Sequence, residues 1–138
     1  MSETTSGQLH AKEMETVLGL SGTERYGYFI ERVADRGEVW GLQNEEGWVL
    51  ISFDDGEAFC VWPHADYARA CTLGDWADCM PEAVSLEELV EELVPALLRD
   101  NLRLAVFPTP AGEAVVVDPR DFQEHLKSTL EHLRSHEQ

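Results

Sequence analysis

Four tryptophans and a dense run of carboxylates share one segment of the chain, and this pairing is the first feature that could carry chemistry. The tryptophans are Trp40, Trp48, Trp62 and Trp76, and the acids among them include Glu45, Glu46, Asp54, Asp55 and Glu57. An indole face attracts a Lys or Arg cation, and surrounding carboxylates add charge attraction. The segment therefore predicts a binding surface for a basic partner, with these candidates: Trp40, Trp48, Trp62, Glu45, Glu46, Asp54 and Asp55.

The same indoles would also suit a hydrophobic core, and this alternative stays open. If the flanking segments are strands, side-chain alternation places Trp40, Trp48 and Trp62 on one side of a sheet. That side is either the core or an exposed aromatic patch.

A second constellation joins His64 and Asp66 just after Trp62 and Pro63. A His with a carboxylate partner suits general-base chemistry. No Ser or Cys nucleophile motif lies nearby, so we assign no catalytic residue. His64 stays a candidate binding residue, because a pocket at this junction would indicate a small-molecule sensor or an enzyme.

Cys60, His64, Cys71 and Cys79 are the right residue types for a zinc site. The paired Cys-x2-Cys spacing that marks such sites is missing, so we expect buried thiols and no metal site. The sequence also lacks a Gly-rich phosphate loop and an H-E-x-x-H motif, and it predicts no cofactor.

The charge balance restricts the classes of partner. Ten Lys and Arg residues oppose 27 Asp and Glu residues, a net charge of −17. The excess is concentrated in residues 37–98, where Arg69 is the one basic residue beside fourteen acids. Such a chain repels nucleic acid and anionic membranes, which leaves a basic protein or a cation as the more natural partner. A solvated acidic surface or salt adaptation is the alternative interpretation.

The N-terminus and the cysteines indicate a compartment. Residues 1–10 are polar, and no apolar run approaches the length of a membrane span. The three cysteines are odd in number and widely spaced, unlike a secreted disulfide scaffold. We therefore expect a cytoplasmic protein.

Periodicity and turn signals predict an N-terminal arm with a short helix in residues 1–20 and one domain in residues 21–138. Capping boxes at Ser21 and Ser85 open two helices, and Pro95 should distort the second near Glu91. The expected helices are 11–18, 21–37, 65–73, 85–98 and one after Asp118, and the expected strands are 38–43, 48–53, 57–62, 102–106 and 114–117.

Two segments of the chain resemble each other without gaps. The stretch from Gly56 to Pro63 matches that from Gly112 to Pro119 in its Gly-Glu-Ala start and its final Pro. This match predicts an internal duplication. The expected fold is α+β, with an antiparallel sheet of about five strands in two related units, packed by helices on one face.

Four short motifs resemble a bacterial family known as domain of unknown function 2750. They are Arg25–Ile30, Val39–Leu42, Gly47–Trp48 and Val61–His64, and the similarity extends from Arg25 to about Phe122. This resemblance implies no activity. A looser, fold-level likeness exists to small bacterial immunity proteins and to the amino-terminal domain of an enhanced-serine-sensitivity protein.

We therefore expect a domain that binds rather than catalyses. The expected partner is a basic protein docked on the acidic, Trp-containing surface, as an immunity protein docks a toxin. A sensor or enzyme at the Trp62–His64 junction is the alternative.

Overall fold

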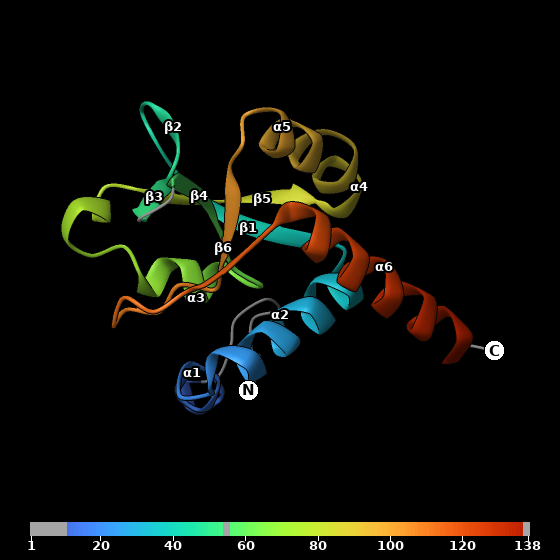
Figure 1. Cartoon of the computed structure of the whole chain (residues 1–138). Helices are drawn as coiled ribbons and strands as arrows, with labels where there is room; N and C mark the ends of the chain where they lie inside the picture. The colour runs from blue at the N-terminus through green and yellow to red at the C-terminus, as the bar shows by residue number, and fades with distance from the viewer. Residues whose placement is uncertain (1–10, 54–55, 137–138) are drawn as a thin grey trace.

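The computed structural model describes residues 11–53 and 56–136 and has an α+β fold (Figure 1). Its helical elements are α1 (Ala11–Leu18), α2 (Gly22–Arg36), α3 (Ala65–Ala70), η1 (Gly74–Trp76), α4 (Leu86–Glu88), η2 (Leu89–Leu93), α5 (Val94–Arg99) and α6 (Pro119–His136). Its strands are β1 (Glu38–Asn44), β2 (Gly47–Trp48), β3 (Leu50–Phe53), β4 (Gly56–Val61), β5 (Met80–Ser85), β6 (Arg103–Val106) and β7 (Val115–Val117). The predicted fold class is confirmed.

The strands form two sheets instead of one. Sheet A has the order β2-β1-β5 and is antiparallel, whereas sheet B has the order β3-β4-β6-β7 and contains a parallel pair, β4 with β6. Reciprocal backbone hydrogen bonds of 2.9 and 2.7 Å between Trp40 and Trp62 join the sheets. The described residues thus contain seven strands, where the sequence predicted about five.

One predicted strand is divided between the two sheets at Val49. Its N–H donates to the Leu42 carbonyl at 2.9 Å, and its own carbonyl accepts from the Cys60 N–H at 3.5 Å. The segment therefore leaves sheet A as β2 and enters sheet B as β3. This passage decides which face each nearby tryptophan occupies.

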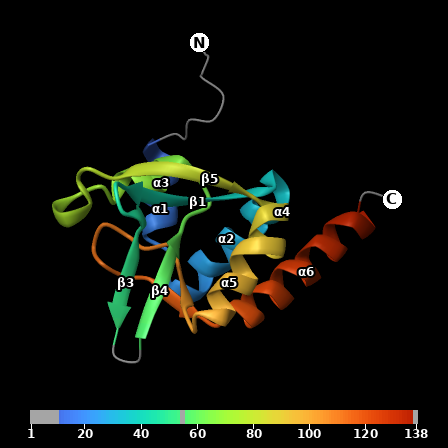
Figure 2. The ribbon, with the colours of Figure 1, turned by 90° about the horizontal axis from the view of Figure 1, so that it is seen from above.

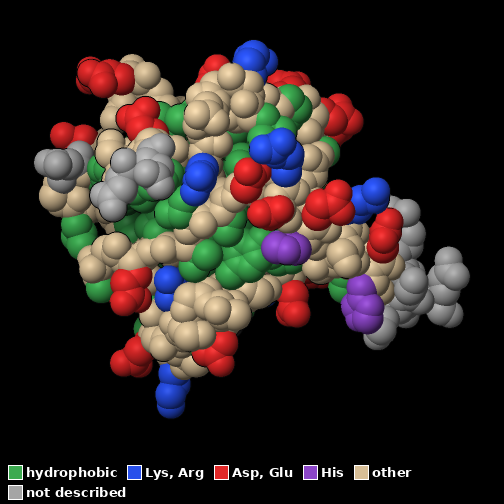
Figure 3. All heavy atoms as spheres, viewed as in Figure 1, with side chains coloured by type: hydrophobic (Ala, Val, Ile, Leu, Met, Phe, Trp, Pro, Cys, Tyr) green, Lys and Arg blue, Asp and Glu red, His purple; other side chains and the backbone are tan. Residues whose placement is uncertain are grey.

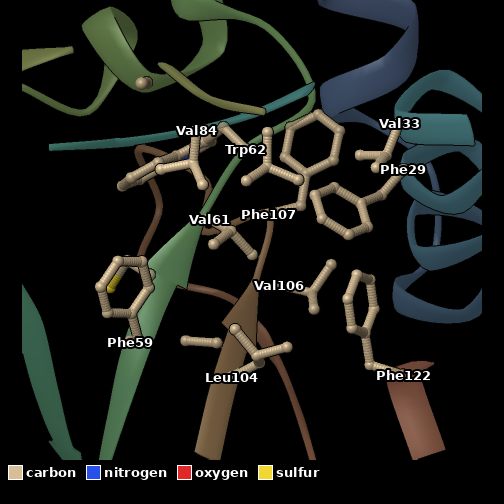
Figure 4. Packing of buried hydrophobic residues seen from close by; sticks show 14 of the residues in the cluster. Phe29, Val33, Phe59, Val61, Trp62, Val84, Leu104, Val106, Phe107 and Phe122 are labelled. Atoms are coloured by element: carbon tan, nitrogen blue, oxygen red, sulfur yellow. The ribbon is translucent and has the colours of Figure 1, made fainter. Parts of the chain in front are cut away.

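Helices cover more than one face of the sheets. Figure 1 shows α3 and the α4–α5 helix on opposite sides of sheet A, and Figure 2 shows α5 beside α6. The core between sheet B and the helices α2 and α6 is aromatic and aliphatic (Figure 4). Its central side chains include Phe29, Val33, Val106, Phe107 and Phe122, each at most 1% exposed.

Both predicted capping residues begin their helices. The Ser21 hydroxyl accepts from the Glu24 N–H at 3.1 Å, and the Glu24 carboxylate accepts from the Ser21 N–H at 3.2 Å. The Ser85 hydroxyl accepts from the Glu88 N–H at 3.1 Å. Gly37 ends α2 with a φ of 77°, a conformation that glycine adopts without a Cβ clash.

Pro95 accounts for the change of helix type in the second of these helices. Proline lacks an N–H and cannot complete the hydrogen bond to the carbonyl four residues earlier. The chain forms the π-helical turn η2 just before it, where the Val94 N–H donates to the Leu89 carbonyl. The predicted distortion near Glu91 thus takes the form of a π turn.

The two matching segments occupy different places in sheet B. Strand β4 lies between β3 and β6, whereas β7 lies at the edge beside β6. Gly56 and Gly112 both have positive φ, but the values differ, 150° at the start of β4 and 94° in the turn before β7. An ancestral duplication stays a prediction.

No helix in residues 11–53 and 56–136 is both long and apolar enough to cross a membrane.

Candidate functional site

A groove of about 180 Å³ lies between sheet A and the α4–α5 helix. Its lining residues come from β2, β5 and the helix: Trp48, Val84, Glu88, Glu92, Leu93 and Ala96. In Figure 1 the β1–β2 hairpin and this helix rise on the same side of sheet A. The groove therefore combines an indole, aliphatic side chains and two carboxylates.

Packing around Gly41 fixes the indole of Trp48. A Cβ atom at Gly41 would lie 2.8 Å from Cζ3 of the Trp48 ring, so the ring occupies space that any other residue would fill. On its strand Trp48 lies opposite Gln43, and its ring centroid is 5.3 Å from that of Phe59. The indole is half-buried, which leaves part of it accessible in the groove.

Glu88 and Glu92 supply the negative charge of the groove. They are four residues apart, a spacing that places side chains on one side of a helix, and both are exposed. A neighbouring hollow of about 320 Å³ is lined by Ser85, Glu87, Glu88, Glu91 and Glu92. Within the described parts of the chain, no Lys or Arg forms an ion pair with these four glutamates. Their charge is thus available to an external cation.

The predicted acids of the β1–β2 turn extend this charge. Glu45 and Glu46 are exposed, and the Asn44 amide oxygen accepts from the Glu46 N–H at 2.8 Å. Figure 3 shows acidic side chains on the corner of the molecule that carries this hairpin. Asp54 and Asp55 lie outside the described residues.

Trp62 belongs to the core and not to a surface. It is 0% exposed, its Nε1 donates to the Pro108 carbonyl at 2.9 Å, and its ring meets that of Trp76 edge-on at 6.2 Å. Pro108 also accepts from the Cys71 thiol at 3.3 Å. Trp62 thus fixes the loop after β6 and cannot contact a partner in this conformation.

Trp40 and Trp48 lie on opposite faces of sheet A, so the three indoles do not meet. Trp40 is the cross-strand partner of Trp62, and such partners share a face. Trp48 is instead the partner of Gln43. Gln43 and Trp40 are three residues apart on β1, and side chains at an odd spacing along a strand point to opposite faces. The half-buried Trp40 donates from Nε1 to Glu38 at 2.9 Å.

His64 caps helix α3. Its Nδ1 accepts a hydrogen bond from the Asp66 N–H at 3.0 Å. His64 is buried, with 9% of its surface exposed. The Asp66 carboxylate lies 3.8 Å from His64 and 2.8 Å from Arg69. Nδ1 is therefore engaged as the helix cap, which is a structural role.

The three cysteines are free and buried. Burial raises the pKa of Cys60 to about 12 and that of Cys71 to about 11, so both remain neutral thiols. Metal binding needs the thiolate. Among the described residues, no group of three His, Cys, Asp or Glu side chains is placed to hold a metal ion.

Sequence reasoning missed most of the groove. The acidic pair of Glu88 and Glu92 was visible as an i, i+4 spacing after a capping box, but nothing local linked it to Trp48. That link depends on β5, which pairs with β1 and brings the following helix over the hairpin.

The sequence is similar to one known protein family. Residues 26–126 match the model of the family described as protein of unknown function (DUF2750). The chain belongs to this family. The matched stretch of this DUF2750 chain contains all six groove residues. No curated protein and no solved structure matches the chain.

Proposed function

We propose that this DUF2750 protein is a non-catalytic binding domain that docks a basic protein, with an Arg or Lys side chain of the partner entering the Trp48 groove. The observation that carries the proposal is the placement of Glu88 and Glu92 beside the half-buried indole of Trp48. A cation on an indole face gains about 0.5–2 kcal/mol, and unpaired carboxylates add charge attraction.

The surrounding charge supports the same class of partner. The chain carries −17, and the exposed Glu45 and Glu46 extend the acidic surface from the groove to the hairpin tip. Such a field accelerates association with a basic protein and rejects an acidic one. Neutralisation of a basic toxin in an immunity-like complex is one form of this docking, and the free cysteines suit a reducing cytoplasm as its setting.

The alternative function at the Trp62–His64 junction has less support. Trp62 is fully buried and the Nδ1 atom of His64 caps a helix, so neither side chain forms an open site. We therefore do not propose a sensor or enzyme there.

Two double variants test the proposal with a matched change of charge. E88Q/E92Q removes the carboxylates that line the groove, and E87Q/E91Q removes two neighbours on the same helix that do not line it. The probe is a short arginine peptide with an acetylated N-terminus and an amidated C-terminus. Its binding is followed by NMR through the indole N–H signal of Trp48. We expect saturable binding that E88Q/E92Q weakens strongly and E87Q/E91Q weakens little.

Partners captured from native cytosol are then compared with the same variants. A partner retained equally by both variants, or an arginine peptide that leaves the Trp48 signal unmoved, would contradict docking in the groove. A partner that E88Q/E92Q loses and E87Q/E91Q retains, as expected for the arginine peptide, would support docking in the groove.

A further inference from the structure

A separate cavity of about 400 Å³ lies between α2 and α6. Helix α2 contributes Tyr28, Glu31, Arg32 and Asp35, and α6 contributes Thr129 and His132. Its volume falls within the range of about 300–1,000 Å³ that is usual for small-molecule sites. It shares no lining residue with the Trp48 groove, so it is argued independently of the proposed function.

Arg32 is the candidate anion-binding residue of this cavity. Its side chain is only 25% exposed, and its guanidinium lies 5.5 Å from the centre of the Tyr28 ring, which holds it in place. Arg32 forms an ion pair with Glu13 on α1, whose carboxylate oxygen lies 3.9 Å from the guanidinium, beyond hydrogen-bond distance. No hydrogen bond of this guanidinium occurs among the described residues, so its fork of N–H donors can bind a ligand carboxylate in exchange for the ion pair with Glu13.

The Glu13 carboxylate is the chain's own anion beside both Arg32 and Tyr28. The Tyr28 hydroxyl donates to Glu13 on α1 at 3.2 Å and lies 3.2 Å from the hydroxyl of the fully buried Tyr67. Burial raises the pKa of both phenols, which therefore keep their protons. Tyr28, Arg32 and Tyr67 lie within the stretch matched by the family, whereas Glu13 lies outside it.

The remaining charges exclude a simple anion as the natural ligand. Glu31 and Asp35 are exposed at the same cavity, and the whole chain is strongly negative. A ligand with one carboxylate and one ammonium group matches the charges of both Arg32 and the two acids that line the cavity. We propose that this cavity binds a small zwitterion of the amino-acid class, with its carboxylate on Arg32 and Tyr28 and its ammonium group toward Glu31 and Asp35.

The test begins with the twenty standard amino acids, each titrated into the full chain and followed by backbone amide NMR and calorimetry. We expect at least one to bind saturably and to shift the amides of Arg32 and Thr129. Its analogue without the amine and its analogue without the carboxylate should each bind at least about tenfold more weakly, because each leaves charged groups of the site unpaired.

Three variants assign the contacts. R32Q should abolish binding, whereas R36Q, which makes the same change of charge at an exposed position of the same helix, should preserve it. E13Q should strengthen binding several-fold, because it removes the carboxylate that competes for Arg32 and Tyr28. Since E13Q requires a gain of affinity, it remains decisive even if R32Q fails to fold.

Three results would overturn the proposal. One is the absence of saturable binding by any of the twenty amino acids. Another is equal binding by R32Q and R36Q or, if R32Q does not fold, binding by E13Q that is no tighter than that of the wild type. The third is equal affinity for the analogue that lacks the amine, which would show that Glu31 and Asp35 play no part.

Discussion

Gly41 determines where the indole of Trp48 lies, and its role is testable by one added methyl group. In G41A the new Cβ would lie 2.8 Å from the Trp48 ring, so the ring must move. We expect a loss of about 1–3 kcal/mol in the free energy of unfolding and a shifted indole signal. Urea unfolding and NMR measure the two effects.

Gly27 provides the matched control. It lies within α2, and a Cβ there would have no atom within 4 Å. G27A should stabilise the protein by about 0.5–1 kcal/mol through helix propensity. Equal losses in both variants would mean that Trp48 does not depend on Gly41.

Cys60 makes stability depend on alkaline pH. Its pKa is raised from 9.0 to about 12 by burial, with Cys71 adding to the effect. The unfolded thiol ionises first, so the stability is complete below pH 9 and falls as the pH rises from 9 toward 12. Between pH 8 and 10.5 the wild type should lose about 2 kcal/mol more than C60A, measured by urea unfolding. Parallel losses in the two proteins would contradict the assignment.

Residue alternation alone could not separate Trp62 from Trp48. Trp48 begins a predicted strand and Trp62 ends one, and both fitted either a core or a surface. The outcome depends on contacts far along the chain: Trp62 reaches the Pro108 carbonyl, while Trp48 packs over Gly41. One tryptophan became core and the other part of a groove.

At the scale of elements, the π turn decides which leucines of the second capped helix are buried. In a regular α-helix, Leu93, Leu97 and Leu98 would all belong to one broad apolar stripe. In the structure Leu97 is 2% exposed, Leu98 is 37% exposed and Leu93 is half-buried in the groove wall. Pro95 and the extra residue of the π turn change the register of the stripe.

Adjacent leucines test this register. L97A should cost about 2–5 kcal/mol because it empties a buried site, whereas L98A should cost less than about 1 kcal/mol. Both losses are obtained from the shift of the urea midpoint, with one common m-value used for the wild type and the variants. A larger loss in L98A would show that the helix faces are assigned wrongly.

Elements with local signals were predictable and those defined by pairing were not. Residues 11–18 form a helix as predicted, and Ser21 and Gly37 bound the next one. Strand β5 (Met80–Ser85) is not among the expected strands, because it contains Pro81 and lacks alternating apolar residues. It is a strand because β1 supplies its hydrogen-bond partners.

At the scale of the whole molecule, the charge of −17 predicts opposite responses of folding and binding to salt. Screening reduces repulsion among the acids, so raising NaCl from 0.05 to 0.5 M should stabilise the fold, on the order of 1 kcal/mol. Association with a basic protein should weaken over the same range, mainly through a slower on-rate.

Neutralising the helix from Glu87 to Glu92 separates these effects. In the variant E87Q/E88Q/E91Q/E92Q, the added NaCl should raise the midpoint of thermal unfolding by less than in the wild type. A wild type that is destabilised by NaCl, or a variant with an unchanged gain, would mean that repulsion among these acids does not limit stability.

The parallel pairing of β4 with β6 has a consequence for how the chain reaches its native state. Ala58 pairs with Arg103, and the connection between them runs through α3, β5 and the α4–α5 helix. Closing so long a connection costs entropy before any contact repays it, which slows folding. During synthesis β4 emerges first, and its Phe59 and Cys60 stay without their β6 partners until residue 106 has left the ribosome. The order of the chain thus leaves one edge of β4, the edge opposite β3, unpaired while residues 62–106 are made, a period in which chaperones or pairing with other chains can intervene.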